Sequence, residues 1–378
     1  MISPWMTPEL EAFRDVVRRF VAGEVVPHQQ RWREQQHVDR DLWRKAGELG
    51  MLLADVPEDF GGSGGTFAHQ AIVFEELALA GDTAFGLHVH AIVAHYLLNH
   101  GTDEQKYKYL PRLASGEIVA AIAMSEPGAG SDLKGIRTTA RRTEQGYRLN
   151  GSKTFISNGY LADLVLVVAR TDPDGGTKGI SLMLLETRDN PGFRVGRILE
   201  KMGQKGQDTC ELFFDDAIVP LCNVLGGEEG RGFAQLMREL PYERTIVGVA
   251  AVACIERTLA LTVAHARERK AFGQALIDMQ NTRFVLAECK TEATVARVFI
   301  DRCIEDLVAG RMDTVQASMA KYWITDLQCK IVDRCLQLFG GYGYMLEYPI
   351  TQMYLDARVQ RIYGGANEIM KEIIARSL

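Results

Sequence analysis

The sequence predicts an α+β protein in which a small β domain lies between two helical domains. Apolar residues recur at helical spacing near both ends of the chain, whereas its middle consists of short apolar or alternating runs divided by turn signals. At 378 residues, the chain also exceeds the length at which a single hydrophobic core stops growing. We therefore expect three domains, over residues 1–117, 118–225 and 226–378.

The first domain begins with a helix signal. Thr7 can cap a helix, Pro8 suits its first position, and Glu9 places an acid in the first turn. Apolar residues then follow at helical spacing. The glycine-rich stretch 57–65 reads as a loop, and helical spacing resumes from residue 69 to about residue 113.

The middle domain is predicted to be a small antiparallel β domain. Turn signals, including Asn150-Gly151, divide this part of the chain. The runs are YRLNGSKTFIS (147–157), LVLVVAR (164–170), GISLMLLE (179–186), FRVGRIL (193–199) and CELFFDDAIV (210–219).

The third domain is predicted to be a helical bundle. Three long segments, Arg244 to Arg267, Thr282 to Val308 and Asp313 to Leu338, have the length and apolar stripe of bundle helices.

Composition limits the function. The net charge of −6, without a basic run, argues against nucleic acid and against a polybasic membrane contact. Seven cysteines without a CxxC pair indicate free thiols and no metal site. No leader segment or apolar stretch of membrane-spanning length is evident, so we expect a soluble protein of a bacterial cytoplasm, or of the mitochondrial matrix if the chain is eukaryotic and processed.

Glycine-rich stretches suggest contact with a ligand rather than a dinucleotide fold. The absence of alternating βαβ units and of GxGxxG makes a Rossmann NAD site improbable. GAGSD (128–132) can be an ordinary turn or a loop whose backbone holds a phosphate. Gly364 and Gly365 can mark a helix stop, or backbone pressed against a ligand.

Five motifs together resemble the acyl-CoA dehydrogenase family over essentially the whole chain. They are AMSEPGAGSDL (123–133), GSKTFISNG (151–159), ERKAFGQ (268–274), QLFGGYGY (337–344) and IYGGANEIMKEIIAR (362–376). Within the family, the stretches FISNG, KMGQKGQDTCELFFDD and LPYER are most similar to the long-chain acyl-CoA dehydrogenases.

The resemblance implies an acyl-CoA dehydrogenase-like fold with a C-terminal four-helix bundle, and FAD between the β domain and the bundle. It also implies a homotetramer built as a dimer of dimers. The implied reaction is α,β-dehydrogenation of a medium-chain, long-chain or branched acyl-CoA to the trans-2-enoyl-CoA, with electrons passed to an electron-transfer flavoprotein.

The resemblance also assigns cofactor residues. Ser125 and the backbone of Met124 would bind the flavin ring, Ser157 would lie at flavin N5, Phe155 would shield the ring, and Arg269 would pair with the pyrophosphate of the partner subunit's FAD. Taken alone, Arg269 could instead be a solvated helix end and Phe272 plain core. The full set implied is Ile122, Met124, Ser125, Gly130, Ser131, Phe155, Ile156, Ser157, Arg269, Phe272, Gln280, Gln337, Leu338, Gly340, Gly341, Ala366, Asn367 and Glu368.

The catalytic base is the point at which the chain departs from many family members. Those members carry a glutamate at the position of Gly364, and a glycine cannot remove the α-proton. In the long-chain and isovaleryl branches the base comes from a bundle helix, at the position of Glu243. We therefore expect Glu243 to be the base, with its pKa raised by poor solvation, although a surface glutamate on an amphipathic helix is the plain alternative.

Substrate contacts are implied mainly by the same motifs. The Gly364 N–H would donate to the thioester carbonyl, as in an oxyanion hole. The predicted set is Ser131, Lys178, Tyr242, Arg244, Gly364 and Gly365.

Two other functions remain open from the sequence. An acyl-CoA oxidase, or another oxygen-using flavoenzyme on the same fold, would change the electron acceptor. A non-catalytic acyl-CoA-binding scaffold would explain the glycine at position 364 without any replacement base.

Overall fold

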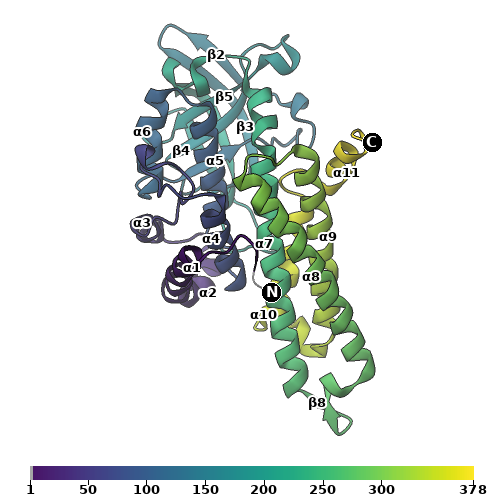
Figure 1. Cartoon of the computed structure of the whole chain (residues 1–378). Coiled ribbons are helices and arrows are strands. Elements are labelled where there is room, and N and C mark those ends of the chain that lie inside the picture. Colours follow the sequence, from purple (N-terminus) through teal and green to yellow (C-terminus); the bar gives the residue numbers. More distant parts are fainter. Residues whose placement is uncertain (1–2) are drawn as a thin grey trace.

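The computed structural model describes residues 3–378. The two ends of the chain are helical, and the sheet formed by its middle lies at one end of the molecule (Figure 1). Thr7 caps the first helix as predicted, because its side chain accepts a hydrogen bond from the Leu10 N–H at 3.2 Å. The helices of the first domain are α1 (Pro8–Phe20), α2 (Gln29–Gln35), α3 (Arg40–Glu48), α4 (Phe67–Leu79), α5 (Leu87–His100) and α6 (Asp103–Ala114).

The sheet of the middle domain is mixed, which corrects the expectation of an antiparallel domain. Its order is β1-β4-β2-β3-β7-β6, and β5 also pairs with β4. The β1–β4 and β2–β4 pairs are parallel, whereas the other pairs are antiparallel. The strands are β1 (Ala120–Ala123), β2 (Thr139–Thr143), β3 (Gly146–Ser157), β4 (Leu164–Arg170), β5 (Ile180–Glu186), β6 (Phe193–Ile198) and β7 (Thr209–Val219).

Asn150-Gly151 lies inside β3 and does not form the turn that its sequence suggested. The pairing of β3 with β7 shifts register between Leu149 and Gly151, which marks a bulge. A Cβ placed on Gly151 would lie 2.6 Å from Thr138 Oγ1. This glycine therefore allows a close approach of two segments rather than a reversal of the chain.

Both faces of β4 are buried, which explains its continuous apolar run. Leu164, Leu166 and Val168 belong to the core that the sheet shares with the helices. Val165 and Val167 belong to a second core on the opposite face of the sheet. The sheet is thus fixed against the helical domains on one side, and this contact surface positions the site described below.

The third domain is a long bundle that extends away from the sheet (Figure 1). Its first helix begins at Gly232 rather than Arg244, because Pro241 is accommodated inside it. The helices are α7 (Gly232–Glu268), α8 (Gln280–Val308), α9 (Thr314–Gln337), α10 (Pro349–Ala357) and α11 (Asn367–Ala375), and a hairpin of β8 (Lys270–Ala271) and β9 (Gln274–Ala275) follows α7.

Helix α7 is the core helix of the molecule. Within residues 3–378 it alone is long and apolar enough to cross a membrane, but 61% of its most apolar window is buried inside the protein. It packs against α4, α5, α8 and α9. All seven cysteines are free thiols.

Candidate active site

The predicted base, Glu243, is buried on α7. Its residue is 7% exposed, and Oε1 accepts a hydrogen bond of 2.8 Å from the Tyr96 hydroxyl on α5. Burial raises the pKa of Glu243 to about 7, although the Tyr96 hydrogen bond favours the ionised form. The alternative that Glu243 is a solvated surface residue is therefore excluded. Its carboxyl group has a pKa near neutral pH, which suits a general base.

Tyr242, the residue before the predicted base, is held by two side chains. Its hydroxyl donates to Asp55 Oδ2 at 3.2 Å, and its ring stacks on His95 with 3.8 Å between ring centroids. Burial disfavours the charged imidazole of His95, but Asp55, 3.1 Å away, outweighs it and raises the pKa of His95. These contacts fix the start of the base-bearing turn of α7 against α5.

The two adjacent glycines form a left-handed segment beside α7. Gly364 has φ 63° and Gly365 has φ 92°, in the region that favours glycine. A Cβ on Gly365 would lie 2.6 Å from Met370 Cε, whereas a Cβ on Gly364 would meet only Val247 Cγ2 at 3.7 Å and Lys321 Cε at 4.0 Å. The left-handed backbone thus favours glycine at both positions, a side chain at 365 would also displace the end of Met370, and position 364 has open space beside it.

This segment lies beside α7, one helical turn after the predicted base. Val247, one helical turn after Glu243, is the nearest neighbour of the space beside Gly364. Lys321 of α9 donates to the Gly365 carbonyl at 2.7 Å and to Asn367 Oδ1 at 2.8 Å. Burial lowers the pKa of Lys321 to about 8. The lysine therefore ties the glycine segment to the bundle.

Arg244 also lies at the glycine segment. It is 3% exposed, donates to Ser318 Oγ at 3.0 Å, and has an Nε atom without a partner. Its Nη2 would lie 3.8 Å from a Cβ on Gly365. The structure thus places Arg244 beside Gly365 and Val247, one turn after Glu243, beside Gly364.

The predicted cofactor residues of the middle domain lie on β1, β3 and the loop after β1. Phe155 is 69% exposed and has φ 61°, which is a strained conformation for an aromatic residue. Ser157 has one weak side-chain contact, to Thr209 at 3.4 Å. Gly130 and Ser131 are exposed, and Ile122, Met124 and Ser125 are partly buried. The Ile156 side chain is buried in the sheet core, so only its backbone can contact a ligand.

A second group of predicted cofactor residues lies at the far end of the bundle. Phe272, on the β8–β9 hairpin, is 97% exposed with φ 51°, which excludes the alternative that it is a core residue. Arg269, Gln337, Leu338, Gly340 and Gly341 line one open cavity of about 510 Å³. Gln280 is exposed at the start of α8.

The predictions at Asn367, Ala366, Glu368 and Lys178 differ in how far side-chain geometry supports them. The Asn367 side chain is 1% exposed and hydrogen-bonds to α9, at Lys321, Tyr322, Thr325 and Asp326, so it is not free to bind FAD. Ala366 has no polar side chain, and Glu368 is exposed. Lys178 is an exposed residue in the short turn before β5.

These residues fit a flavin dinucleotide in chemistry and in exposure. Two aromatic residues, Phe155 and Phe272, are held exposed in strained backbone, a combination common at binding sites. A Cβ on Gly128, Gly130, Gly340 or Gly341 would meet nothing within 4 Å, so backbone there is open to a ligand. Arg269 supplies a cation suited to a pyrophosphate.

Several residues of the site were not predicted from the sequence. Asp55, Lys321 and Ser318 lie in segments without a motif, and they reach the site only through the packing of the first domain and of α9 against α7. Val247 could have been found, because it lies one turn after Glu243 on the same helix face.

Comparison with known proteins agrees with this geometry. Profiles described as the N-terminal, middle and C-terminal domains of acyl-CoA dehydrogenase match residues 7–117, 121–217 and 230–378. The mouse protein named long-chain specific acyl-CoA dehydrogenase, mitochondrial, is 47% identical, covering 98% of this chain and 86% of that protein.

Solved structures show the same relationship. An acyl-CoA dehydrogenase from Geobacillus kaustophilus is 45% identical with a TM-score of 0.97, covering 100% of this chain and 99% of that one. An acyl-CoA dehydrogenase from Bacillus anthracis, titled as complexed with FAD, is 32% identical with a TM-score of 0.92, covering 100% of this chain and 68% of that one. The chain therefore belongs to the acyl-CoA dehydrogenase family, a family of FAD-dependent oxidoreductases that act on CH–CH groups.

Proposed function

We propose that this chain dehydrogenates a long-chain acyl-CoA to the trans-2-enoyl-CoA, with Glu243 as the base that removes the α-proton. The observation that supports this proposal is a buried carboxylate on α7 whose pKa is raised to about 7. A glycine at 364 removes one candidate base, and Glu243 lies one helical turn before Val247, the α7 residue nearest to Gly364.

Each residue near the base has a proposed task. Tyr96 holds Glu243 by its hydrogen bond, so that the ionised oxygen points at the α-carbon. The Gly364 N–H donates to the thioester carbonyl and stabilises the developing enolate. Lys321 fixes that backbone through the Gly365 carbonyl. Ser131, Lys178, Tyr242 and Arg244 are the proposed contacts to the rest of the substrate.

FAD is the proposed cofactor, and when bound it supplies the acceptor for the hydride that leaves the β-carbon. The residues proposed to hold it are those of β1, β3 and the following loops in one subunit, together with Arg269, Phe272, Gln280 and the segment 337–341 of its partner. An electron-transfer flavoprotein is the proposed electron acceptor, a homotetramer the proposed assembly, and the cytoplasm the proposed location.

The test is an anaerobic titration of the purified holoprotein with acyl-CoAs from butyryl to palmitoyl, followed by flavin absorbance. We expect long-chain thioesters to bleach the wild-type flavin. We expect Glu243→Gln to bind them but to be reduced about 10²- to 10⁴-fold more slowly, because the base is lost.

The matched control is Glu239→Gln, one turn earlier on α7. This buried carboxylate bonds to His100 and Asn99, so the change is chemically identical but leaves the proposed base in place. The charge of Glu239 raises the pKa of Glu243, so we expect Glu239→Gln to keep bleaching the flavin, with a pH midpoint shifted downward. Equal bleaching of wild type and Glu243→Gln would show that the base is elsewhere. Hydrogen peroxide produced at the rate of turnover in air would instead indicate an oxidase.

A further inference from the structure

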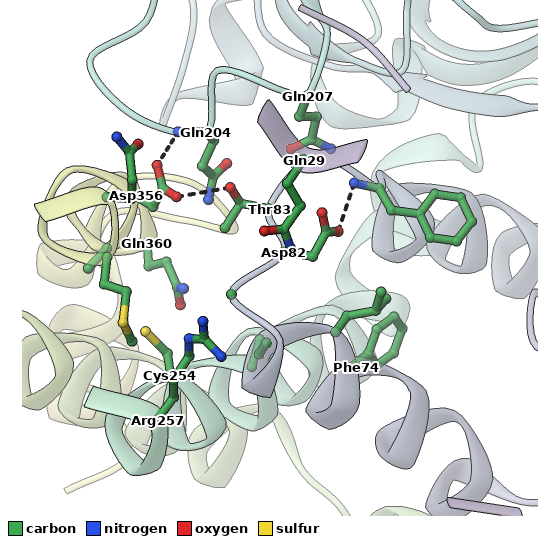
Figure 2. Close-up of a pocket in the computed structure, with 18 of the residues that line it drawn as sticks. Gln29, Phe74, Asp82, Thr83, Gln204, Gln207, Cys254, Arg257, Asp356 and Gln360 are labelled. Atoms are coloured by element: carbon green, nitrogen blue, oxygen red, sulfur yellow. Dashed lines mark hydrogen bonds between the residues drawn. The ribbon is translucent and has the colours of Figure 1, made fainter. Parts of the chain in front are cut away.

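A partly open cavity of about 210 Å³ lies between α4, α7, α10 and the loop before β7 (Figure 2). One part of its lining is apolar and another part is polar. Phe74, Leu77, Ile246, Val247 and Ala250 supply apolar walls. Another part carries glutamines, two arginines and two aspartates, several of which point toward one another in Figure 2.

The apolar walls connect this cavity to the candidate active site. Val247 borders the space beside Gly364 and also lines the cavity, as does Tyr363. From Glu243, the cavity-lining residues Val247, Ala250, Cys254 and Arg257 follow at spacings of three and four, so they form one stripe along α7. A chain that starts at the base can therefore follow this stripe into the cavity.

The length of the stripe suits a long acyl chain. An α-helix rises about 1.5 Å per residue, so Cys254 and Arg257 lie about 16 and about 21 Å from Glu243 along the axis. An extended chain advances about 1.2 Å per bond, as the polypeptide backbone does over three bonds per residue. An extended acyl chain that starts at Glu243 would therefore need about 13 to 17 carbon–carbon bonds to reach Cys254 and Arg257, which is close to the length of a palmitoyl chain.

The polar part of the cavity contains hydrogen-bonding groups without partners. We call these four residues the polar chamber: Gln207, Arg257, Gln328 and Gln360. Among the described residues, Gln207 Nε2, Arg257 Nε, Gln328 Oε1 and Gln360 Oε1 are buried atoms with no hydrogen-bond partner. The three glutamines are 2%, 1% and 7% exposed. A buried polar atom without a partner is costly, so such a group calls for a ligand or water.

The chemistry of the polar chamber favours a neutral group that both donates and accepts. Two of the unpartnered atoms are donors and two are acceptors. Asp82 and Asp356 also line the cavity, and their carboxylates already accept hydrogen bonds from Phe85 N–H and from the Thr83 hydroxyl. A carboxylate ligand can only accept hydrogen bonds, so it would be repelled by the two aspartates and would leave the glutamine oxygens without a donor. A hydroxyl group can donate to the glutamine oxygens and accept from the unpartnered N–H groups.

We propose that the polar chamber receives the distal end of the acyl chain and selects long-chain acyl-CoAs that carry a hydroxyl group there. This inference rests on the proposed function, because it requires that acyl-CoAs bind along α7. It adds a recognition site for the end of the chain that is remote from the reacting carbons.

The test compares palmitoyl-CoA, 16-hydroxyhexadecanoyl-CoA and the mono-CoA thioester of hexadecanedioic acid, using the holoprotein and kcat/KM for flavin reduction. We expect the hydroxylated substrate to exceed palmitoyl-CoA by about three- to tenfold, the contribution of one net hydrogen bond. We expect the carboxylated substrate to be slower than both.

The variant Gln328→Leu/Gln360→Leu removes both unpartnered acceptors. In the described part of the chain both amide oxygens lack partners, so replacing these side chains by leucine should not unfold the protein. We expect it to reverse the preference, so that palmitoyl-CoA becomes the better substrate. The control is Gln316→Leu on the same helix, α9, whose amide bonds to Asp306 outside the cavity; this variant should keep the wild-type preference.

The outcomes separate this inference from the proposed function. Equal kcat/KM for the first two substrates in wild type and in the double variant would mean that only water occupies the polar chamber. A wild-type preference for palmitoyl-CoA would also overturn the inference, yet both results would leave the dehydrogenation intact. If no thioester bleaches the flavin, the proposed function fails and this inference fails with it.

Discussion

At the scale of single residues, the activity depends on how readily Glu243 ionises. Its pKa lies near 7 because burial outweighs the hydrogen bond from Tyr96. The base must be deprotonated to act, so kcat/KM should rise with pH through a midpoint near 7.

Tyr96→Phe should move this midpoint upward. The substitution removes a donor to the carboxylate, which raises the pKa of Glu243 further, and a hydrogen bond to a charged group corresponds to about one pKa unit. The pH profile of kcat/KM measures the shift. The control is Tyr109→Phe on α6, whose hydroxyl bonds to Glu186. An unchanged midpoint would show that Tyr96 does not tune the base.

At the scale of elements, α7 joins the base to the acyl path. Ala250 lies on the cavity stripe, two turns beyond Glu243, and its small side chain leaves the path open. We expect Ala250→Leu to lower kcat/KM for palmitoyl-CoA by about tenfold or more while leaving octanoyl-CoA nearly unaffected, because only the longer chain must pass this position.

The matched control for this prediction is Ala260→Leu, on the exposed face of the same helix. It adds the same side chain without entering the cavity. A parallel loss for both chain lengths in Ala250→Leu would mean that the substitution distorts the site and that the acyl chain does not follow α7.

The elements also show what the sequence could and could not predict. The helical spacing of α8 and α9 and the capping by Thr7 are local signals, so their bounds were predicted within a few residues. The turn predicted at Asn150-Gly151 was wrong, because a bulge in a long strand favours the same residue types as a turn. The parallel pairs of β4 could not be predicted, since strand partners are chosen by non-local packing.

The site was predictable only where a motif carried it. Glu243 and Gly364 were identified because one replaces the other in related sequences, and the burial of Glu243 agrees with its proposed role. Asp55 and Lys321 were not predicted, because nothing local distinguishes an aspartate in a loop or a lysine on a helix until the fold brings them together.

At the scale of the whole molecule, the far end of the bundle exposes large aromatic side chains that nothing in the described part of a single subunit covers. Phe272 is 97% exposed and Tyr344 is 84% exposed. Along the chain, each lies within three residues of a residue that lines the open cavity, Arg269 for the first and Tyr342 for the second. Exposed aromatic residues of this kind are typical of surfaces that bind another chain or a ligand.

Phe272→Ser should therefore weaken both assembly and cofactor retention. We expect a lower flavin content per chain and a shift toward smaller species in sedimentation velocity, because a partner's FAD is proposed to lie against this residue. Tyr107→Ser, an exposed aromatic residue on α6, is the control and should keep wild-type flavin content. An unchanged tetramer with full flavin would contradict the proposed role of the hairpin.

The open space beside Gly364 bears on how such an enzyme can change over generations. The Cβ of a side chain added there would meet Val247 and Lys321 at ordinary contact distance, at the cost of a left-handed backbone conformation. A lineage could thus pass through a form with two candidate bases, in which mutual repulsion raises the pKa of one carboxylate, and then lose either base. The base could thus move between α7 and the segment at Gly364 during evolution without any ancestor that lacked a base.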